Sequence, residues 1–394
     1  MKELTCIVVG GGYAGINAVK AIQKRFKGEA SKRKLRVILI DKNPYHFRKV
    51  LLFKPAVGDE DITVPLTRLF PDGVEFVQAT VTKIESKEKR LIFRDAETNE
   101  SSLKYDILVL AVGSVVRQPD SNQGGLALAS LEAAQKIRES WRVNLQKAIQ
   151  EKSTKERQRL MTIAVAGAGI SGIETSAELA YFIRKDAAKL GLDPDAVRIK
   201  LCNANKRLFS NGPEKVGLKL ERSLGACGVT VLHESKVLHE KEGTLTLPNG
   251  ETMPVGLCIW TLGLLPNPML QSIGLPITSE GYVIVDASYR VPGADGVYSI
   301  GDCARIVDPA SGRLDGKTCK EATFQAARLG KILVADIIGR PAPSHKRGID
   351  LFCFSLGPGQ GMLWTHQCGL DIIFTGKLGW RMRKFTWDSA SLLK

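Results

Sequence analysis

Two glycine-rich turns, each between a short apolar run and a helical pattern, constrain this chain of 394 residues most strongly. The first is Gly10-Gly-Gly-Tyr-Ala-Gly15 and the second is Gly167-Ala-Gly-Ile-Ser-Gly172. In a turn of this kind the first glycine permits the bend, the second lets the backbone approach a pyrophosphate, and the third lets the helix pack on the strand. The helix N-terminus then faces the phosphate charge. Two such turns predict two dinucleotide-binding domains of the Rossmann type.

The residues around each turn have the periodicity that such a domain needs. Strand, helix and strand are predicted over 5–9, 16–26 and 35–40 in the first unit, and over 160–165, 173–189 and 197–202 in the second. Further strands are predicted over 75–84 and 89–93, as a hairpin sheet, and over 107–112 and 259–262. Helices are predicted over 131–150 and 320–338, and the charged residues 151–159 are predicted to be a solvent-facing connector.

This order predicts an α/β fold in which the second unit is inserted within the first. We expect residues 1–120 and 265–343 to form the first domain, residues 121–264 the inserted domain, and residues 344–394 a separate C-terminal region. The two turns thus belong to different domains of one chain.

The residue that ends the second strand differs between the units. Asp41 ends it in the first, where a carboxylate can accept hydrogen bonds from a ribose diol. In the second unit no carboxylate follows the strand, and Lys206 and Arg207 come soon after it. That pocket would accept a 2′-phosphate, and hence NADPH as well as NADH. Alternatively, Lys206 and Arg207 are ordinary solvated charges.

The net positive charge of the chain is consistent with an acidic partner. Lys and Arg outnumber Asp and Glu by 56 to 41, for a net charge of +15, which suits anionic lipid, nucleic acid or a phosphorylated cofactor. The eight cysteines are scattered, with no C-x-x-C pair, so we expect neither a metal site nor a dithiol motif. The N-terminus does not read as a signal peptide, and no apolar run of about 18 residues occurs. A cytoplasmic location is expected, with any membrane contact peripheral.

The motifs together resemble a known group of flavoproteins, those with two dinucleotide-binding domains. The resemblance covers about residues 1–340 and is carried by 7–15 with Asp41, 108–114, 167–174, 259–263 and 297–302. Within that group the chain is most similar to type II NADH dehydrogenases and to ferroptosis-suppressor and apoptosis-inducing-factor-like NAD(P)H:quinone reductases. Local likenesses to these lie at 44–47, 64–70 and 355–357.

The resemblance implies FAD on the first unit and NADH or NADPH on the second, with two electrons passed to a quinone and no protons pumped. It implies that Asp302 touches the flavin's ribityl or pyrophosphate region. The implied cofactor-binding residues are Gly10, Gly11, Gly12, Tyr13, Ala14, Gly15, Asp41, Lys54, Val81, Gly167, Gly169, Gly172, Gly301 and Asp302. From the residues alone, Lys54 could equally be a surface charge and Val81 a strand core residue.

Glu174 and Lys320 are the implied catalytic residues. In this fold Glu174 would project toward flavin and nicotinamide, and Lys320 stands where the ferroptosis-suppressor-like relatives have a lysine that faces this glutamate. Glu174 could instead be an ordinary first-turn carboxylate, stabilised by the helix dipole. The type II enzymes have an Ala-Gln-x-Ala turn at the quinone site, whereas this chain has Phe324-Gln-Ala-Ala327. Phe324 could stack on a quinone or belong to the helix core.

The cysteines disfavour two related activities. Disulfide reductases need a redox pair shortly after the first unit, and residues 43–55 contain no cysteine. Sulfide:quinone reductases need one near the second glycine turn, and residues 161–180 contain none. Cys303, beside Asp302, is expected to be a small buried residue.

The segment 372–387 interleaves aromatic and basic side chains. They include Trp380, Phe385, Trp387, Arg381 and Arg383, a composition that suits a bilayer interface with anionic lipid. The same residues could instead pack on the FAD domain or on a second copy in a homodimer. Because no nucleic-acid motif accompanies them, nucleic acid is ranked last among the partners.

The sequence therefore favours a peripheral FAD-dependent NAD(P)H:quinone oxidoreductase. Two alternatives remain at this point: a reductase for a small electron-carrier protein, and a nicotinamide-responsive flavoprotein with little turnover.

Overall fold

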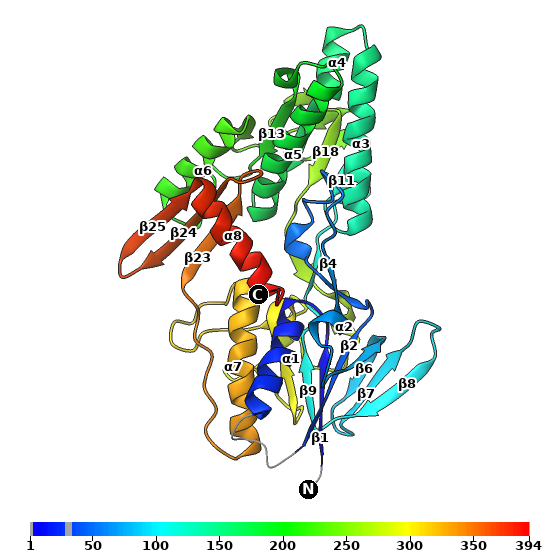
Figure 1. Cartoon of the computed structure of the whole chain (residues 1–394), viewed down its shortest axis with the longest axis vertical. Helices are drawn as coiled ribbons and strands as arrows, with labels where there is room; N and C mark the ends of the chain where they lie inside the picture. Colours follow the sequence, from blue (N-terminus) through cyan, green and yellow to red (C-terminus); the bar gives the residue numbers. More distant parts are fainter. Residues whose placement is uncertain (1–2, 28–33, 394) are drawn as a thin grey trace.

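A parallel five-stranded sheet forms the centre of the first domain in this computed structural model, which describes residues 3–27 and 34–393 (Figure 1). Its strand order is β21 (Val297–Ser299), β9 (Ile107–Leu110), β1 (Leu4–Val9), β2 (Leu35–Asp41) and β5 (Glu75–Gln78). Side chains alternate between the two faces of β1. Cys6 and Val8 pack with helices α1 (Tyr13–Phe26) and α7 (Cys319–Ile337). Ile7 and Val9 pack with the antiparallel sheet of β6 (Thr80–Glu85), β7 (Arg90–Arg94) and β8 (Glu100–Lys104). Both faces are covered, so the buried residues 6–9 of the strand are all apolar.

The second domain repeats this plan. Its parallel sheet has the order β11 (Leu126–Ala127), β18 (Leu257–Trp260), β12 (Thr162–Ala166), β13 (Arg198–Cys202) and β14 (Val229–Leu232). Ile163 and Val165 pack with helices α3 (Leu131–Gln150), α5 (Ile170–Lys189) and α6 (Glu214–Ala226). Ala164 and Ala166 face a small antiparallel sheet of β15 (His239–Lys241), β16 (Thr244–Thr246) and β17 (Thr252–Pro254).

The chain enters and leaves the second domain side by side. β10 (Ser114–Val116) leads out of the first domain and pairs antiparallel with β19 (Leu264–Pro266), which leads back. The second Rossmann-like domain is therefore inserted in the first, as the sequence predicts. The remaining short elements are β3 (Tyr45–Phe47), β4 (Thr63–Pro65), α2 (Leu66–Leu69), α4 (Thr154–Leu160), β20 (Val283–Ile284) and β22 (Ala304–Arg305), with 3-10 helices at Lys49–Leu51, Pro194–Ala196, Pro268–Gln271 and Gly301–Cys303.

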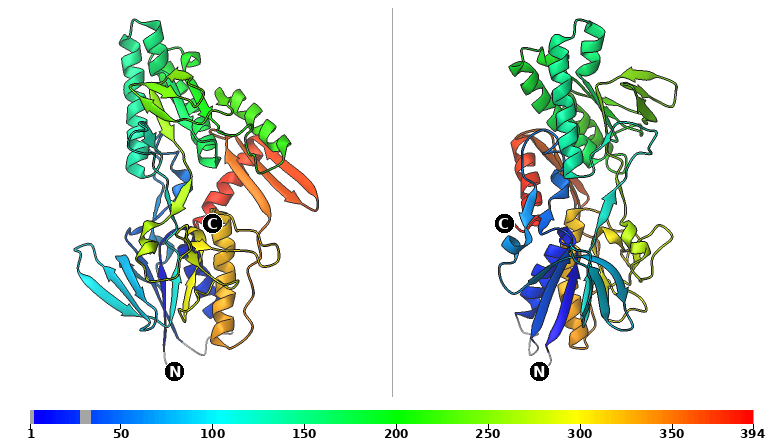
Figure 2. Two further views of the ribbon diagram at one scale, coloured as in Figure 1. Left: turned by 180° about the vertical axis from the view of Figure 1, so that it is seen from behind. Right: turned by 90° about the vertical axis from the view of Figure 1, so that its right-hand side faces the viewer.

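The C-terminal region forms an antiparallel sheet and a helix. The sheet consists of β23 (Asp350–Ser355), β24 (Gly361–Gln367) and β25 (Leu370–Thr375), and helix α8 (Gly376–Ala390) follows it directly. α8 lies between the two domains in each view (Figures 1 and 2). It contacts both of them, because Arg383 pairs with Glu174 of α5 and the Ala390 carbonyl accepts from Asn17 of α1. No helix within residues 3–27 and 34–393 is long and apolar enough to cross a membrane.

Two of the predicted elements differ from the structure. Residues 75–84 are not one strand: β5 completes the parallel sheet, and the chain turns at Ala79, whose amide donates to Asp41, before β6 starts the antiparallel one. Residues 151–159, predicted to be a solvent-facing connector, are exposed or half-buried as expected, but they are not irregular, because α4 begins after Ser153. The Ser153 hydroxyl accepts from the Glu156 amide at 3.3 Å and caps that helix. The Ser-x-x-Glu spacing is a sequence signal for such a cap.

Candidate active site: two cradles and the residues between them

The first glycine turn has the geometry that a pyrophosphate cradle requires. Gly10 has φ +107°, and a Cβ there would lie 2.5 Å from the Ala111 oxygen. A Cβ on Gly15 would lie 1.7 Å from the Gly10 oxygen, so the start of α1 can approach β1 only because this residue is glycine. Gly12, by contrast, has open space on its Cβ side and is the N-cap of α1. The cradle is therefore lined by backbone and open toward a helix N-terminus, which suits a phosphate group.

The second turn repeats these contacts. Gly167 has φ +116°, and a Cβ there would lie 2.5 Å from the Thr261 oxygen. A Cβ on Gly172 would lie 1.8 Å from the Gly167 oxygen. Gly169 has open space and is the N-cap of α5. The residues of both turns thus fit a dinucleotide in the same way.

Asp41 and His46 support the first turn. Asp41 Oδ2 accepts from the Gly11 amide at 2.5 Å and Oδ1 from the Asn43 amide at 2.7 Å. Burial raises the pKa of Asp41, and these amides oppose that effect. His46 is fully buried, with Nδ1 2.9 Å from the Gly11 oxygen and its ring edge-to-face with Tyr13. The sequence places His46 only in a family-like segment and does not reveal this supporting contact.

The Gly301-Asp302 loop lies beside the first turn. A Cβ on Gly301 would lie 2.7 Å from the Ala14 Cβ, and the Gly301 amide donates to Gln325 at 2.8 Å. Asp302 accepts from the Ser114 hydroxyl at 2.7 Å. Lys49 donates to the Ser114 oxygen at 2.9 Å, and burial lowers the pKa of Lys49. The sequence does not single out Lys49, and it includes Ser114 only as the last residue of the family-like segment 108–114.

Glu174 lies buried between the domains, but its partner is not Lys320. Arg383 of α8 donates to both carboxylate oxygens of Glu174, with Nε–Oε1 at 2.8 Å and Nη2–Oε2 at 3.0 Å. The Ser355 amide also donates to Oε1, at 2.8 Å. Lys320 instead pairs with Glu321 at 2.8 Å and donates to the Ile349 oxygen at 2.8 Å. The predicted Glu174–Lys320 pair is therefore corrected to Glu174–Arg383.

Burial and charge act in opposite directions on Arg383. Desolvation alone would lower the pKa of Arg383, but the Glu174 carboxylate outweighs it and the pKa lies above its ordinary value. The buried guanidinium is thus held in its charged form by its partner.

A second carboxylate lies one turn further along α5. Glu178 is fully buried and pairs with Lys54 at 2.8 Å. Burial raises the pKa of Glu178, while Lys54 opposes this. Lys54 is thus a partner of Glu178 and not a free surface charge. Val81 is buried in the core beneath the parallel sheet, where it pairs with Phe93.

The tail is docked rather than free. Arg383 and Trp387 face inward and are buried, whereas Lys377, Arg381 and Phe385 are exposed on the outer side of α8. The packing alternative that the sequence left open therefore applies to the inner half of the set, and the expected membrane contact stays a prediction for the exposed outer half alone.

Three further residues have clear places. Arg207 donates to the oxygens of Phe209, Ser210 and Gly212, so it holds its own loop, whereas Lys206 is exposed. Phe324 is 43% exposed and so does not belong to the helix core. Cys303 is fully buried, in line with the sequence expectation.

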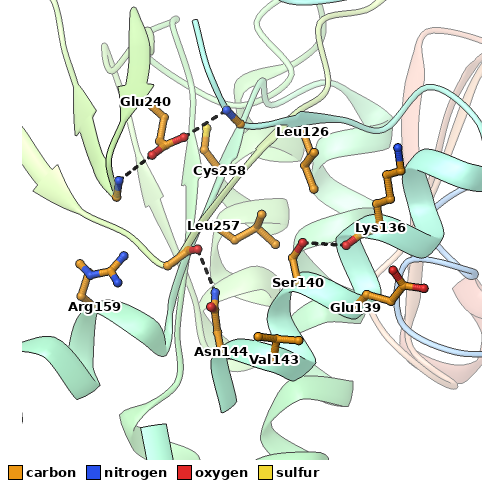
Figure 3. A pocket seen from close by; sticks show the side chains of 13 residues that line it. Leu126, Lys136, Glu139, Ser140, Val143, Asn144, Arg159, Glu240, Leu257 and Cys258 are labelled. Atoms are coloured by element: carbon orange, nitrogen blue, oxygen red, sulfur yellow. Dashed lines mark hydrogen bonds between the residues drawn. The ribbon is translucent and has the colours of Figure 1, made fainter. Parts of the chain in front are cut away.

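A surface groove lies at the end of the second sheet that is opposite to the glycine turn (Figure 3). It is lined by residues of α3 and by the start of β18. Asn144 donates to the Gly256 oxygen at 2.8 Å, and the Gly256 amide pairs with Thr162 at the start of β12. Gly167 follows the other end of that strand. The groove is therefore separate from the nucleotide cradle.

Residues 4–326 match the family model of pyridine nucleotide-disulphide oxidoreductases. The chain belongs to this family. The match includes both cradles and ends inside α7, before the C-terminal region. Residues 43–55, which follow the first unit, contain no cysteine.

The chain is similar to several relatives in the family. It is 27% identical over 345 residues to demethylphylloquinone reductase NdbB of Synechocystis, covering 85% of this chain and 80% of that protein. It is 26% identical over 338 residues to the type II NADH:quinone oxidoreductase of Staphylococcus aureus, with coverage of 82% and 80%. The structure of NDH2 from Plasmodium falciparum in complex with NADH superposes with TM-score 0.80 at 17% identity, covering 100% of this chain and 97% of that one. That likeness establishes the shared fold.

Proposed function

We propose that this chain is an FAD-dependent NAD(P)H:quinone oxidoreductase, which takes a hydride from NADH or NADPH and passes two electrons to a quinone. The observation that carries the proposal is the pair of matching cradles, in which Gly12 and Gly169 each stay open above a helix N-terminus. Two dinucleotides held on adjacent domains can bring their rings together for hydride transfer. The names of the relatives in Synechocystis and Staphylococcus agree with a quinone as acceptor.

The first cradle would hold FAD, which when bound supplies the two-electron chemistry. Its pyrophosphate would lie against the Gly10–Gly15 turn, and Asp41 keeps unused acceptor directions for a ribose hydroxyl. The Gly301-Asp302 loop is placed beside the same turn by the Ala14 contact. Lys54 and the Val81 backbone would complete the pocket.

The second cradle would hold NADH or NADPH through Gly167, Gly169 and Gly172. Glu174 follows directly and would face the two rings from the start of α5. Lys320 starts α7 next to β23 and would orient this end of the site through its bonds to the Ile349 and Leu351 oxygens. An exposed Lys206 with no neighbouring carboxylate would let the pocket take a 2′-phosphate.

Exposed residues on α7 and α8 would serve the quinone and the membrane. Phe324 is 43% exposed next to the Gln325 that binds the Gly301 loop, so the open part of its ring would stack on a quinone. The exposed outer side of α8, with Lys377, Arg381 and Phe385, would rest on an anionic bilayer. The protein would then be a peripheral protein on the cytoplasmic side of the membrane.

Anaerobic stopped-flow spectroscopy tests the reaction. NADH or NADPH should bleach the visible absorbance of the bound flavin, and a water-soluble quinone should restore it within the turnover time. If neither nucleotide bleaches the flavin, or if no quinone reoxidises it, the proposed function is refuted.

A further inference from the structure

The donors that hold Glu174 all come from the C-terminal region. The Arg383 guanidinium grips both carboxylate oxygens, and the Ser355 amide adds a third hydrogen bond. Both residues lie beyond residue 326, where the family match ends. The Glu174 side chain is only 2% exposed, and that of Arg383 10%. A site residue of the family domain is thus fixed by a segment outside that domain.

The other cations near Glu174 are already committed. Lys54 pairs with Glu178 at 2.8 Å, and Lys320 pairs with Glu321 at 2.8 Å. Among the residues that the structure describes, Arg383 is the cation that contacts Glu174. A buried carboxylate without its counter-charge is strongly unfavourable.

Arg383 is itself held in place from the first domain. Its guanidinium lies over the ring of Trp387, 5.0 Å from the centroid, and Trp387 packs against Phe53. One residue further, Asp388 pairs with Arg48 at 2.7 Å. α8 is therefore anchored on the first domain while Arg383 reaches α5 of the second.

We propose that Arg383 is a positioning residue, which holds the Glu174 carboxylate in one orientation between the two cradles so that the C-terminal region completes the nucleotide-reduction site. The inference rests on the proposed function. A carboxylate offers about four acceptor directions. The two guanidinium N–H groups of Arg383 and the Ser355 amide use three of them, which leaves one free acceptor direction on Oε2. The planar fork of Arg383 fixes both oxygens at once, which a lysine ammonium cannot do.

Four variants form the test: Arg383→Met, Arg383→Lys, Glu174→Gln and the double variant Glu174→Gln/Arg383→Met. At saturating NADH, Arg383→Met should slow flavin reduction at least tenfold, and Arg383→Lys should recover part of the rate. In the Glu174→Gln background, Arg383→Met should cause no further loss, because two residues that act as a unit are not additive.

Thermal unfolding gives a second readout that does not depend on activity. Arg383→Met should lower the Tm by leaving a buried carboxylate unpaired, and adding Glu174→Gln should raise it again. If Arg383→Met does not fold, the rates of flavin reduction in Arg383→Lys and in the double variant, compared with Glu174→Gln, still test the positioning role.

Arg290 provides the matched control. It forms another two-pronged pair, with Asp336, at Nε–Oδ2 3.0 Å and Nη2–Oδ1 2.5 Å. Arg290→Met should lower the Tm without slowing flavin reduction. Equal slowing in Arg290→Met and Arg383→Met, or additive losses in the double variant, would overturn the positioning role. If NADH fails to bleach the wild-type flavin, the proposed function fails instead, and the Tm cycle still reports on the pair.

Discussion

His46 should make the folded chain sensitive to mild acid. Its side chain is fully buried in β3, with Nδ1 bonded to the Gly11 oxygen, and Nε2 has no hydrogen-bond partner among the residues that the structure describes. Burial lowers the pKa of His46 from 6.5 to about 4; the bond to Gly11 opposes this, and nearby Arg48 reinforces it. The folded chain therefore prefers the neutral ring, at the turn proposed to hold FAD.

The sign and size of the effect follow from these two values. A base whose folded pKa lies below its unfolded pKa stabilises the fold above pH 6.5 and loses that contribution as the pH falls from 6.5 toward 4. At about 1.4 kcal/mol per pH unit, the full contribution is about 3 kcal/mol. The linkage relation puts about 2 kcal/mol of this between pH 7 and pH 5.

Urea unfolding of wild type and His46→Asn at pH 7, 6 and 5 measures the contribution of His46 to the free energy of unfolding. The asparagine amide can still donate to the Gly11 oxygen but does not titrate in this range. The difference in unfolding free energy between the two proteins should therefore shrink or reverse by about 2 kcal/mol from pH 7 to pH 5, since wild type alone loses the His46 contribution. Flavin fluorescence, which reports FAD release, should change over the same range.

A half-exposed histidine serves as the control. His366 pairs with Asp371 at 2.8 Å on the C-terminal sheet, and His366→Asn should retain the wild-type loss of stability. If wild type and His46→Asn lose stability in parallel between pH 7 and pH 5, the reasoning about His46 is refuted.

Three further predictions use the same set of assays. Gly15→Ala should lower the free energy of unfolding by at least about 3 kcal/mol and abolish FAD binding, because its methyl group would lie 1.7 Å from a carbonyl oxygen. Gly172→Ala should retain FAD but no longer be reduced by NADH. The flavin content of the purified variants and their stopped-flow traces distinguish the two outcomes. Lys206→Glu should lower kcat/KM about tenfold for NADPH relative to NADH, because a carboxylate repels the 2′-phosphate; an unchanged ratio would assign Lys206 to the solvated surface. Lys377→Glu with Arg381→Glu should weaken binding to anionic vesicles at least about 30-fold at about 1 kcal/mol per charge, and unchanged sedimentation would remove the membrane assignment.

The glycine turns were predictable because each is a local structure. The contact that forces glycine at position 15 is made with position 10 of the same turn, although Gly10 itself also approaches the distant Ala111. The cradle geometry can therefore be read from spacing alone. Where an element depends on a neighbour distant in sequence, as when residues 75–84 divide between two sheets, the local pattern looks like one strand.

The partner of Glu174 could not be read in this way. Arg383 lies 209 residues further along the chain, and its basic neighbours make the segment look like a surface. One signal was present: Gly379, Arg383 and Trp387 are spaced by four and share one helix face, and all three are buried. The pattern places Arg383 on the inner face, but only the three-dimensional contact shows which acid receives it.

Because α8 has a buried face and an exposed face, the two faces need separate variants. Deletion after Leu370 would remove the outer basic face and Arg383 together, so a loss of activity could not be assigned to membrane binding or to the site. Charge reversal at Lys377 and Arg381 changes the outer face alone, because both side chains are exposed while Arg383 is buried. If the outer face only docks the protein, these reversals should leave NADH reduction of the flavin unchanged in the absence of vesicles. A slower reduction without vesicles would mean that the two faces of α8 are coupled, so that contact of the outer face with a bilayer would also affect Glu174 through the helix.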